Sequence, residues 1–231
     1  MKSIIFDVET TGFPEPGKKM ECQPYIIEFG AMFIDDDNKV IRTINQLLNP
    51  GDRIYDRSLR SKREEKRKLD GTVTVPTKDD CFTDKLPSII PKITGITDEM
   101  LVGKPTFREC MVLFGAFFQG ADMLIAHNAD FDTKVLQIAL DRDGIAGFPI
   151  PKEIFCSMHG YQHVAPTPKW LKLVELYKII MGEELAQTHR ALDDCEAVYD
   201  ILVKDGFFNK LKLSEPVEEN DQEEDAGQWY E

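Results

Sequence analysis

The chain has 231 residues, of which 42% are hydrophobic and 30% are charged, and its formal net charge is −13. This composition is that of an ordinary globular protein, long enough to bury a sizeable core. No apolar run reaches 18 residues, so no transmembrane helix is expected. Asp7 falls where a secretory signal needs apolar residues, which indicates a cytoplasmic or otherwise intracellular protein. The five cysteines are never spaced as Cys-x-x-Cys, which argues against disulfides and a zinc site.

Three strands are predicted at the start of the chain. Apolar and alternating residues indicate strands at 3–8, 25–34 and 40–48. The links between them are short, which favours an antiparallel meander. Gly30 interrupts the second strand and is expected to mark a bulge.

The segment at about 50–90 is interpreted as a basic insertion. Residues 52–68 contain eight Lys or Arg against four acids, and an extended loop is expected after them. Lys and Arg neutralise phosphates, so this insertion could contact a nucleic-acid backbone. The alternative is a solvated excursion of mixed charge. Beyond it, Thr97 is expected to cap a helix.

Helices then alternate with short strands. Helical spacing of apolar residues predicts helices at 107–118, 131–140, 171–181 and 191–204, and strands are predicted at 121–126 and 154–158. The whole pattern predicts an α/β fold with helices on both faces of a mixed sheet. Residues 1–210 are expected to form one domain. Residues 215–231 hold eight acids and no Lys or Arg, and are expected to form a disordered tail.

A pair of carboxylates follows the first predicted strand. Asp7 and Glu9 lie in the run Asp7-Val-Glu-Thr-Thr-Gly12, and alternate residues of a strand share a face. Their charges repel, and a cation between them removes that cost. Oxygen ligands suit hard ions such as Mg²⁺ or Mn²⁺. The alternative is a strand end that carries two exposed acids.

Two more acidic clusters stand at predicted strand–helix junctions. They are Ala-His-Asn-Ala-Asp-Phe-Asp at 126–132 and His-Arg-Ala-Leu-Asp-Asp at 189–194. Taken singly, their acids could cap helices and His189 could be a surface residue. Taken with Asp7 and Glu9, they supply the carboxylates and the near-neutral base that two-metal phosphodiester hydrolysis requires. His127 and Asn128 are expected to fix the turn between strand and helix.

In this order, the three motifs resemble those of the DEDDh branch of DnaQ-like 3′–5′ exonucleases, in the RNase H-like superfamily. A Gly-Ile-Thr segment at 95–97 and the Lys-Leu-Val-Glu-Leu run at 172–176 strengthen the likeness, which covers about residues 3–205. The resemblance implies an RNase H-like mixed five-stranded sheet. Its three-strand antiparallel meander is followed by parallel strands and is flanked by helices.

The resemblance also implies roles for single residues. The family spacing selects Asp132 over Asp130 and Asp194 over Asp193. Two divalent metal ions, Mg²⁺ or Mn²⁺, would then be held by four acids: Asp7, Glu9, Asp132 and Asp194. His189 would be the general base, which completes the catalytic set. Contacts to the terminal nucleotide are expected from Thr10, Thr11, Phe13 and Phe131, although Phe131 could instead belong to the core. Many relatives carry a His before Gly-Ile-Thr, where this chain has Lys92 and Ile93.

These observations predict a metal-dependent 3′–5′ exonuclease that releases 5′-mononucleotides from single-stranded or frayed DNA, in replication, proofreading or repair. The expected partner is the 3′ end of a single strand, with DNA favoured and RNA possible, and no membrane. A polymerase or another replication partner could dock on the acidic tail at 215–231. One alternative is an exoribonuclease like RNase T or oligoribonuclease, because no motif reports on the 2′-hydroxyl. Another is an inactive adaptor that binds a replication partner.

Overall fold

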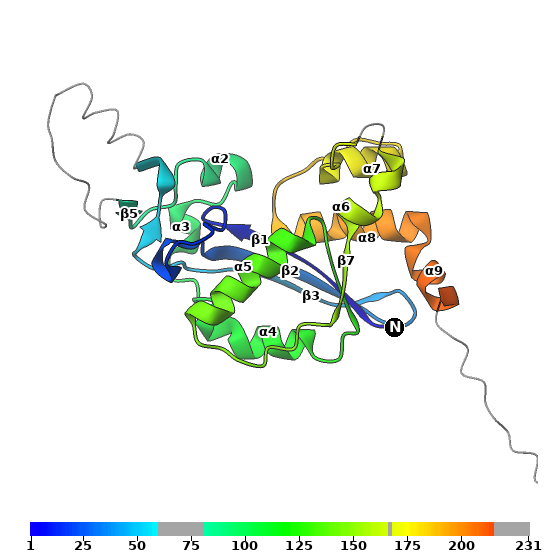
Figure 1. Ribbon diagram of the computed structural model, residues 1–231, viewed down its shortest axis with the longest axis horizontal. Coiled ribbons are helices and arrows are strands. Elements are labelled where there is room, and N and C mark those ends of the chain that lie inside the picture. The colour runs from blue at the N-terminus through cyan, green and yellow to red at the C-terminus, as the bar shows by residue number, and fades with distance from the viewer. Residues whose placement is uncertain (60–80, 166–167, 215–231) are drawn as a thin grey trace, which may run out of the picture.

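The centre of the molecule is a five-stranded mixed sheet (Figure 1). The computed structural model describes residues 1–59, 81–165 and 168–214. Across the sheet the order is β3-β2-β1-β6-β7. The strands are β1 (Ser3–Thr10), β2 (Ile26–Ile34), β3 (Val40–Leu47), β6 (Met123–Ala126) and β7 (Glu153–Cys156). β1, β2 and β3 pair antiparallel, whereas β1, β6 and β7 pair parallel. The predicted meander, the parallel strands and the RNase H-like fold are therefore confirmed.

β1 divides its side chains between the two faces of the sheet. Ile4, Phe6 and Val8 pack in one buried cluster, and Ile5 packs in another. Because alternate residues of a strand share a face, Asp7 and Glu9 follow Ile5 onto its face of the sheet. The apolar residues of β1 are thus buried on both faces of the sheet. Asp7 and Glu9 lie further along the same strand, on the face of Ile5.

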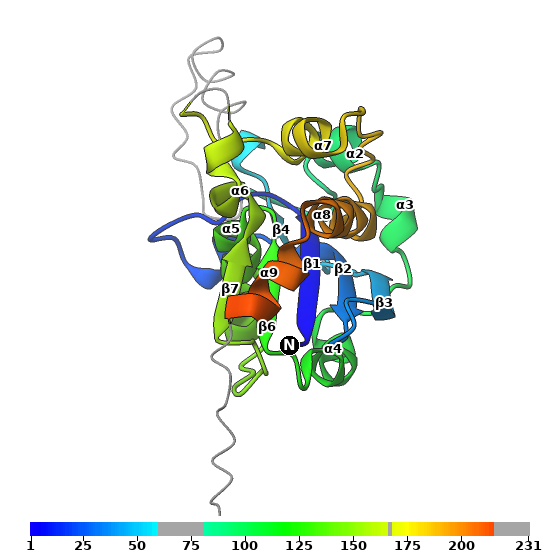
Figure 2. The same cartoon turned by 90° about the vertical axis from the view of Figure 1, so that its right-hand side faces the viewer.

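Helices cover both faces of the sheet (Figures 1 and 2). Phe114 and Phe118 of α4 (Met111–Phe118) and Leu136 of α5 (Ala129–Arg142) belong to the cluster of Phe6. The cluster of Ile5 contains side chains from the remaining large helices, α7 (Leu173–Met181), α8 (Ala191–Asp205) and α9 (Phe207–Ser214). Each face of the sheet therefore has its own core.

The predicted helices after residue 106 are found, with small shifts. α7 ends at Gly182 and α8 ends at Gly206, and both glycines have left-handed backbones (φ 81° and 71°). The first predicted helix of this part begins with a 3-10 turn, η3 (Arg108–Cys110), before α4. α9 was not predicted, and its Phe207 and Phe208 are buried in the cluster of Ile5. Two short turns, α6 (Ser157–Gly160) and η4 (Gln162–Val164), follow β7.

The region around the predicted basic insertion is more regular than expected. Described residues there form β4 (Ile54–Tyr55), β5 (Phe82–Thr83), α2 (Ile90–Thr94) and α3 (Asp98–Leu101), and η1 (Met20–Cys22) precedes them. A third buried cluster lies here, with Ile54, Ile90 and Leu101 among its members. The expected extended loop before Pro91 is thus wrong in part, because apolar side chains fold it onto β2. Thr97 does precede α3, but its side chain makes no capping bond.

Two predicted segments cannot be compared with the structure. Residues 60–80 of the basic insertion and the acidic tail at 215–231 lie outside the described residues. Among the described residues, no helix combines the length and the apolar character that crossing a membrane requires.

Gly30 does not mark a bulge. The register of β2 shifts elsewhere, between Glu9 and Thr10 of its partner β1 and between Phe33 and Ile34. Gly30 pairs with Asp7, and a Cβ built on it would lie 2.5 Å from the amide nitrogen of Leu192. Real Cβ atoms essentially never come that close to another heavy atom. The glycine is therefore needed for the close approach of α8 to the sheet.

Replacing Gly30 with Ala is expected to lower the free energy of unfolding by about 1–3 kcal/mol, because the added methyl group must push α8 away from β2. Urea denaturation of the purified protein measures this change. Gly115→Ala is the matched control. Its nearest neighbour would lie 4.0 Å away, and removing a helical glycine should stabilise the protein by roughly 0.5–1 kcal/mol. Equal effects of the two substitutions would show that the packing argument is wrong.

Candidate active site

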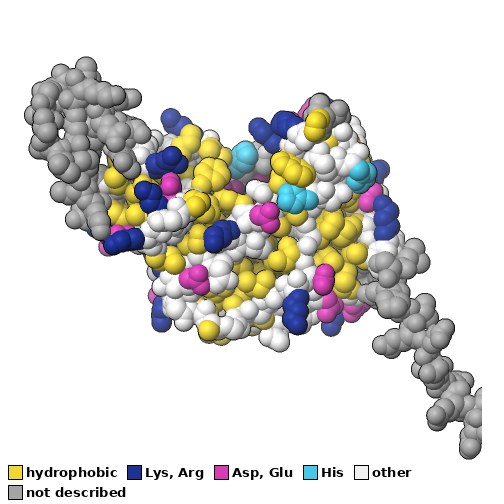
Figure 3. Space-filling view, in the orientation of Figure 1, with side chains coloured by type: hydrophobic (Ala, Val, Ile, Leu, Met, Phe, Trp, Pro, Cys, Tyr) yellow, Lys and Arg dark blue, Asp and Glu magenta, His cyan; other side chains and the backbone are white. Residues whose placement is uncertain are grey.

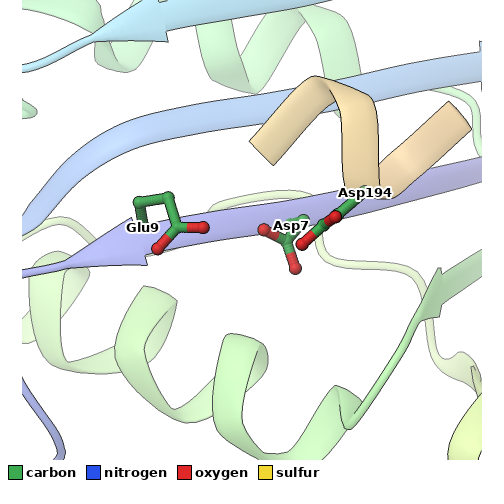
Figure 4. Close-up of side chains that lie close together, drawn as sticks. All are labelled: Asp7, Glu9 and Asp194. Carbon is green, nitrogen blue, oxygen red and sulfur yellow. The ribbon is translucent and has the colours of Figure 1, made fainter. Parts of the chain in front are cut away.

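Three carboxylates meet at the end of β1. Asp7 and Glu9 project from β1, and Asp194 comes from the first turn of α8 (Figure 4). One oxygen atom from each of the three lies within 4.8 Å of the other two. Three oxygen donors this close are suited to a hard divalent cation and not to a soft one. The structure therefore brings together three of the acids that the sequence singled out.

Burial and mutual repulsion disturb the titration of these groups. Burial, followed by the charges of Asp194 and Glu28, raises the pKa of Asp7 well above its usual range. Burial and the charge of Asp7 raise the pKa of Glu9 from 4.5 to about 9. Burial also raises the pKa of Asp194, although the side chains of Gln187 and His189 oppose the shift. Ionised together, these acids are costly unless positive charge balances them.

Asp132 lies beside this group and is almost fully buried. It belongs to the first turn of α5, and it accepts a hydrogen bond from the backbone N–H of Val8 at 3.3 Å. Burial and the charge of Asp7 raise the pKa of Asp132 well above its usual range. Asp132 is thus electrostatically coupled to Asp7, but it is not part of the three-oxygen cluster. Asp130, its neighbour in the motif, is exposed.

His189 sits on the turn that leads into α8. Its backbone is left-handed, with φ 51°, a conformation that few non-glycine residues adopt. The side chain is partly buried, and its charge acts on the pKa of Asp194. Asp193, the other acid of this motif, is exposed and accepts a hydrogen bond from the hydroxyl of Thr188. The turn thus brings the charge of His189 within reach of Asp194, while Asp193 is exposed.

An ion pair that no sequence motif indicated anchors this turn. Glu28 of β2 is fully buried, and its carboxylate accepts hydrogen bonds from the Arg190 guanidinium. The backbone N–H of Ala191 also donates to it, at 3.1 Å. Glu28 pairs with Glu9 across the strands, so this contact lies next to the carboxylate cluster. The available signal was a lone charge in the apolar run from Tyr25 to Ile34, since a buried charge requires a partner.

Gln187 was missed as well. Its side-chain amide donates to both carboxylate oxygens of Asp194, at 3.2 and 3.1 Å. These bonds orient the Asp194 carboxylate and favour its ionised form. No pattern in the sequence pointed to Gln187, because it lies outside the motif that begins at His189.

The expected substrate contacts lie beyond the carboxylates, where β1 ends. The Thr10 hydroxyl donates to the carbonyl of Gly12, and the Thr11 hydroxyl accepts from the N–H of Tyr25. Both hydroxyls therefore shape the turn itself. The Phe13 side chain is 80% exposed, and its ring centre lies 5.6 Å from that of Phe131. This pair offers an open aromatic edge next to the acids.

A cavity of about 450 Å³ opens on the same turn. Its walls include Thr11, Gly12 and Phe13 from the end of β1, Tyr55 from β4, and Ile90 and Ile93 from α2. Most of this lining is apolar. The cavity could take the flat apolar face of a small ring system, with the acids to one side.

His127 is a structural residue, as expected. One ring nitrogen lies 3.0 Å from the Ser157 hydroxyl and the other lies 3.0 Å from the Leu171 carbonyl. Burial lowers the pKa of His127 to about 4, so the ring is neutral near pH 7. Asn128 follows it with a left-handed backbone, φ 69°, and starts α5. His159 and His163, which match no motif, are exposed.

The mixed sheet and its flanking helices place the chain in the RNase H-like fold class. The family model described as exonuclease matches residues 72–202, more than half of the chain. The chain therefore belongs to the exonuclease family, of the DnaQ-like type. The matched range contains the second and third motifs, and Asp7 and Glu9 lie before it.

Similar proteins agree with this assignment. A PolC-type DNA polymerase III from Clostridium perfringens is 27% identical over 218 residues, which cover 94% of this chain and 12% of the polymerase. An uncharacterized exonuclease of Escherichia phage 186 is 30% identical over 149 residues, which cover 58% of this chain and 73% of the phage protein. This chain thus corresponds to a small part of the polymerase and to most of the phage protein.

A solved structure shows the same fold. It is the nuclease domain of 3′hExo, a DEDDh family member bound to rAMP. The likeness has a TM-score of 0.59 and covers 89% of this chain and 92% of that one, at 18% sequence identity.

In the metal-free protein, stability should fall as pH rises from about 4.5 to 9. Over this range folded Glu9 keeps a proton that the unfolded chain releases. The folded state binds more protons, so each step up in pH favours unfolding. Melting temperatures measured in EDTA across this range test the expectation. A melting temperature that rises steadily with pH would contradict it.

Asp7→Asn removes one of the repelling charges and should raise the metal-free melting temperature by roughly 2–6 °C. Mn²⁺ should stabilise the wild-type protein and have a much smaller effect on this variant. Asp37→Asn is the control, because Asp37 is exposed in a turn far from the cluster along the chain. A metal-free Asp7→Asn protein less stable than wild type would refute the proposed repulsion.

Arg190→Leu is expected to cost about 3–5 kcal/mol of unfolding free energy, because it leaves the Glu28 charge buried without its partner. Combining it with Glu28→Met should recover most of the loss, since the lone charge is then gone. Denaturant titration of both proteins makes the comparison. If the double variant were no more stable than Arg190→Leu, the loss would not come from the unpaired carboxylate.

Proposed function

We propose that this chain is a metal-dependent 3′–5′ exonuclease that removes 5′-mononucleotides from single-stranded or frayed DNA ends. The convergence of Asp7, Glu9 and Asp194 at the end of β1 is the observation that carries the proposal. Asp132 lies against the same strand, and His189 stands on the turn before Asp194. This is the set of acids and base that phosphodiester hydrolysis requires.

The charge balance supports two divalent ions, Mg²⁺ or Mn²⁺. Among the described residues around the site, five carboxylates influence one another: Asp7, Glu9, Glu28, Asp132 and Asp194. Arg190 balances one of them. The remaining excess of negative charge favours the binding of divalent cations. Asp7, Glu9 and Asp194 are the ligands that geometry favours, and Asp132 would support the second ion from the side of α5.

The residues of the chain then divide the work of hydrolysis. The bound cations would supply charge that stabilises the phosphate oxygens in the transition state and acidifies water. His189 takes the proton from the attacking water, a task that suits an imidazole near neutral pH. Gln187 holds the carboxylate of Asp194 in one orientation. The Glu28–Arg190 ion pair fixes the turn that carries the base.

The terminal nucleotide would lie between β1 and α5. Phe13 and Phe131 offer rings for its base or sugar, and such contacts need no particular sequence. Thr10 and Thr11 act through the backbone of the turn that they stabilise. The neighbouring cavity is lined by Ile90 and Ile93 and would receive the apolar face of the terminal base. This contact would stand in place of the one between His and the base. This arrangement favours an unpaired end.

A role in DNA replication, proofreading or repair is supported by the likeness to a DNA polymerase. This chain covers only 12% of that polymerase, so the likeness supports a role for the shared part and says nothing about polymerase activity. A polymerase or another replication partner would bind the acidic residues 215–231. The DEDDh neighbour was solved with rAMP, so RNA is tested beside DNA.

Asp7→Ala and His189→Ala should each slow digestion at least about 100-fold, because they remove a metal ligand and the general base. The assay follows a 5′-labelled oligonucleotide as single-stranded DNA, duplex DNA and RNA, with Mg²⁺ or Mn²⁺. Progressive shortening from the 3′ end with release of 5′-mononucleotides is the expected pattern. Circular dichroism verifies that each variant is folded.

Asp130→Ala and Asp193→Ala are the matched controls. Each lies beside a proposed ligand in the sequence, is exposed, and should leave the rate unchanged. Full activity in folded Asp7→Ala protein would reject the site. Faster digestion of RNA would reassign the substrate, and a wild-type protein without activity on any strand would favour a binding adaptor.

A further inference from the structure

Two exposed aromatic rings lie together on the loops that follow β7. The rings of His159 and Trp170 have centres 4.6 Å apart and are inclined at 48°. Trp170 is 52% exposed, and His159 is exposed as well. Exposing this much of a tryptophan ring to water is unfavourable, which favours a role for the ring in binding a ligand.

Hydrogen bonds tie the segments that carry the two rings to the second motif. His127 contacts the hydroxyl of Ser157, two residues before His159, and the carbonyl of Leu171, the residue after Trp170. His127 lies in the turn between β6 and α5, and α5 carries Phe131 and Asp132. The two loops are therefore fastened to the same turn that presents the proposed substrate and metal ligands.

The surface around these elements is hollowed. In the space-filling view the hollow lies between the α2 side and the α6–α7 side of the molecule (Figure 3). Histidine and hydrophobic side chains lie next to one another on its α6–α7 side. Phe13 and Phe131 form a separate aromatic pair at the end of β1. Aromatic pairs thus occur both at the end of β1 and in the segment from α6 to α7.

Positive charge accompanies the second pair of rings. Lys169 and Lys172 flank Trp170 in sequence and are exposed, and Lys169 also bonds Glu175 at 2.9 Å. Exposed aromatic rings with neighbouring ammonium groups suit a base and its phosphate, and they accept any base. An apolar peptide would gain little from the ammonium groups.

We propose that Trp170 and His159 form a stacking platform for a base upstream of the terminal nucleotide of a single strand. The inference rests on the proposed function, which supplies the strand, and it adds a second binding position. Phe13 and Phe131 hold the nucleotide that is removed, and the platform holds the strand that stays. Binding should therefore strengthen once the strand is long enough to reach Trp170.

Fluorescence of Trp170 tests the platform directly. The sequence contains two tryptophans, so Trp229→Phe makes Trp170 the single reporter in the full-length chain. With Mg²⁺ and hydrolysis-resistant phosphorothioate linkages, oligothymidylate of four nucleotides should quench the emission through stacking. Thymidine 5′-monophosphate should not, because it fills the terminal position only. Equal quenching by both, or by neither, would overturn the platform.

Kinetics provide the second measurement. Trp170→Ala should raise KM for the oligonucleotide roughly 5- to 100-fold through lost stacking, while kcat stays unchanged. Hydrolysis of thymidine 5′-(p-nitrophenyl phosphate), which has no upstream base, should be unaffected. Trp170→Phe should restore most of the affinity. Leu113→Ala is the control, because Leu113 is a similarly exposed apolar residue on α4.

The two proposals fail in different ways. If wild-type protein hydrolyses both substrates and Trp170→Ala leaves KM for the oligonucleotide unchanged, the platform is wrong and the exonuclease assignment stands. If wild-type protein hydrolyses neither substrate, the proposed function is wrong.

Discussion

The ion pair between Glu28 and Arg190 is the contact on which the candidate site depends. Glu28 is buried in the middle of the sheet, and it holds both the Arg190 guanidinium and the first backbone N–H of α8. Gly30, two residues further along β2, leaves the space that this approach requires. The ion pair and Gly30 together set the distance of α8 from the sheet and its rotation over β1. Asp194 faces Asp7 and Glu9 for that reason, and His189 is held in its unusual backbone conformation at the start of the same helix.

The same arrangement creates electrostatic tension. The fold collects acids whose pKa values rise because they are buried and repel one another. A structure that served stability alone would disperse them. Perturbed acids gathered at a strand end are typical of functional sites, where positive charge from a ligand completes the balance. The apolar clusters on both faces of the sheet supply the stability that tolerates this tension.

Local patterns predicted most of the fold. Apolar alternation located the strands, and Gly182 and Gly206 marked the ends of two helices because their left-handed backbones stop a helix. Periodicity also put Asp7 and Glu9 on one face. The role of Gly30 could not be predicted, since it depends on a helix that begins 161 residues further along the chain. Long-range pairing also hid Glu28–Arg190, and α9 was missed because its short run gains its stability from packing of Phe207 and Phe208.

The order of the motifs along the chain has a consequence for synthesis. Asp7 belongs to the first strand of the described chain, whereas Asp194 belongs to one of its last helices and His189 to the turn before that helix. Chains fold as they emerge, and α8 can settle on β2 only after almost everything before it has been made. An unfinished polypeptide therefore has the strand acids without their partners on α8. The cluster of Asp7, Glu9 and Asp194 is thus assembled only when translation of the domain is nearly finished.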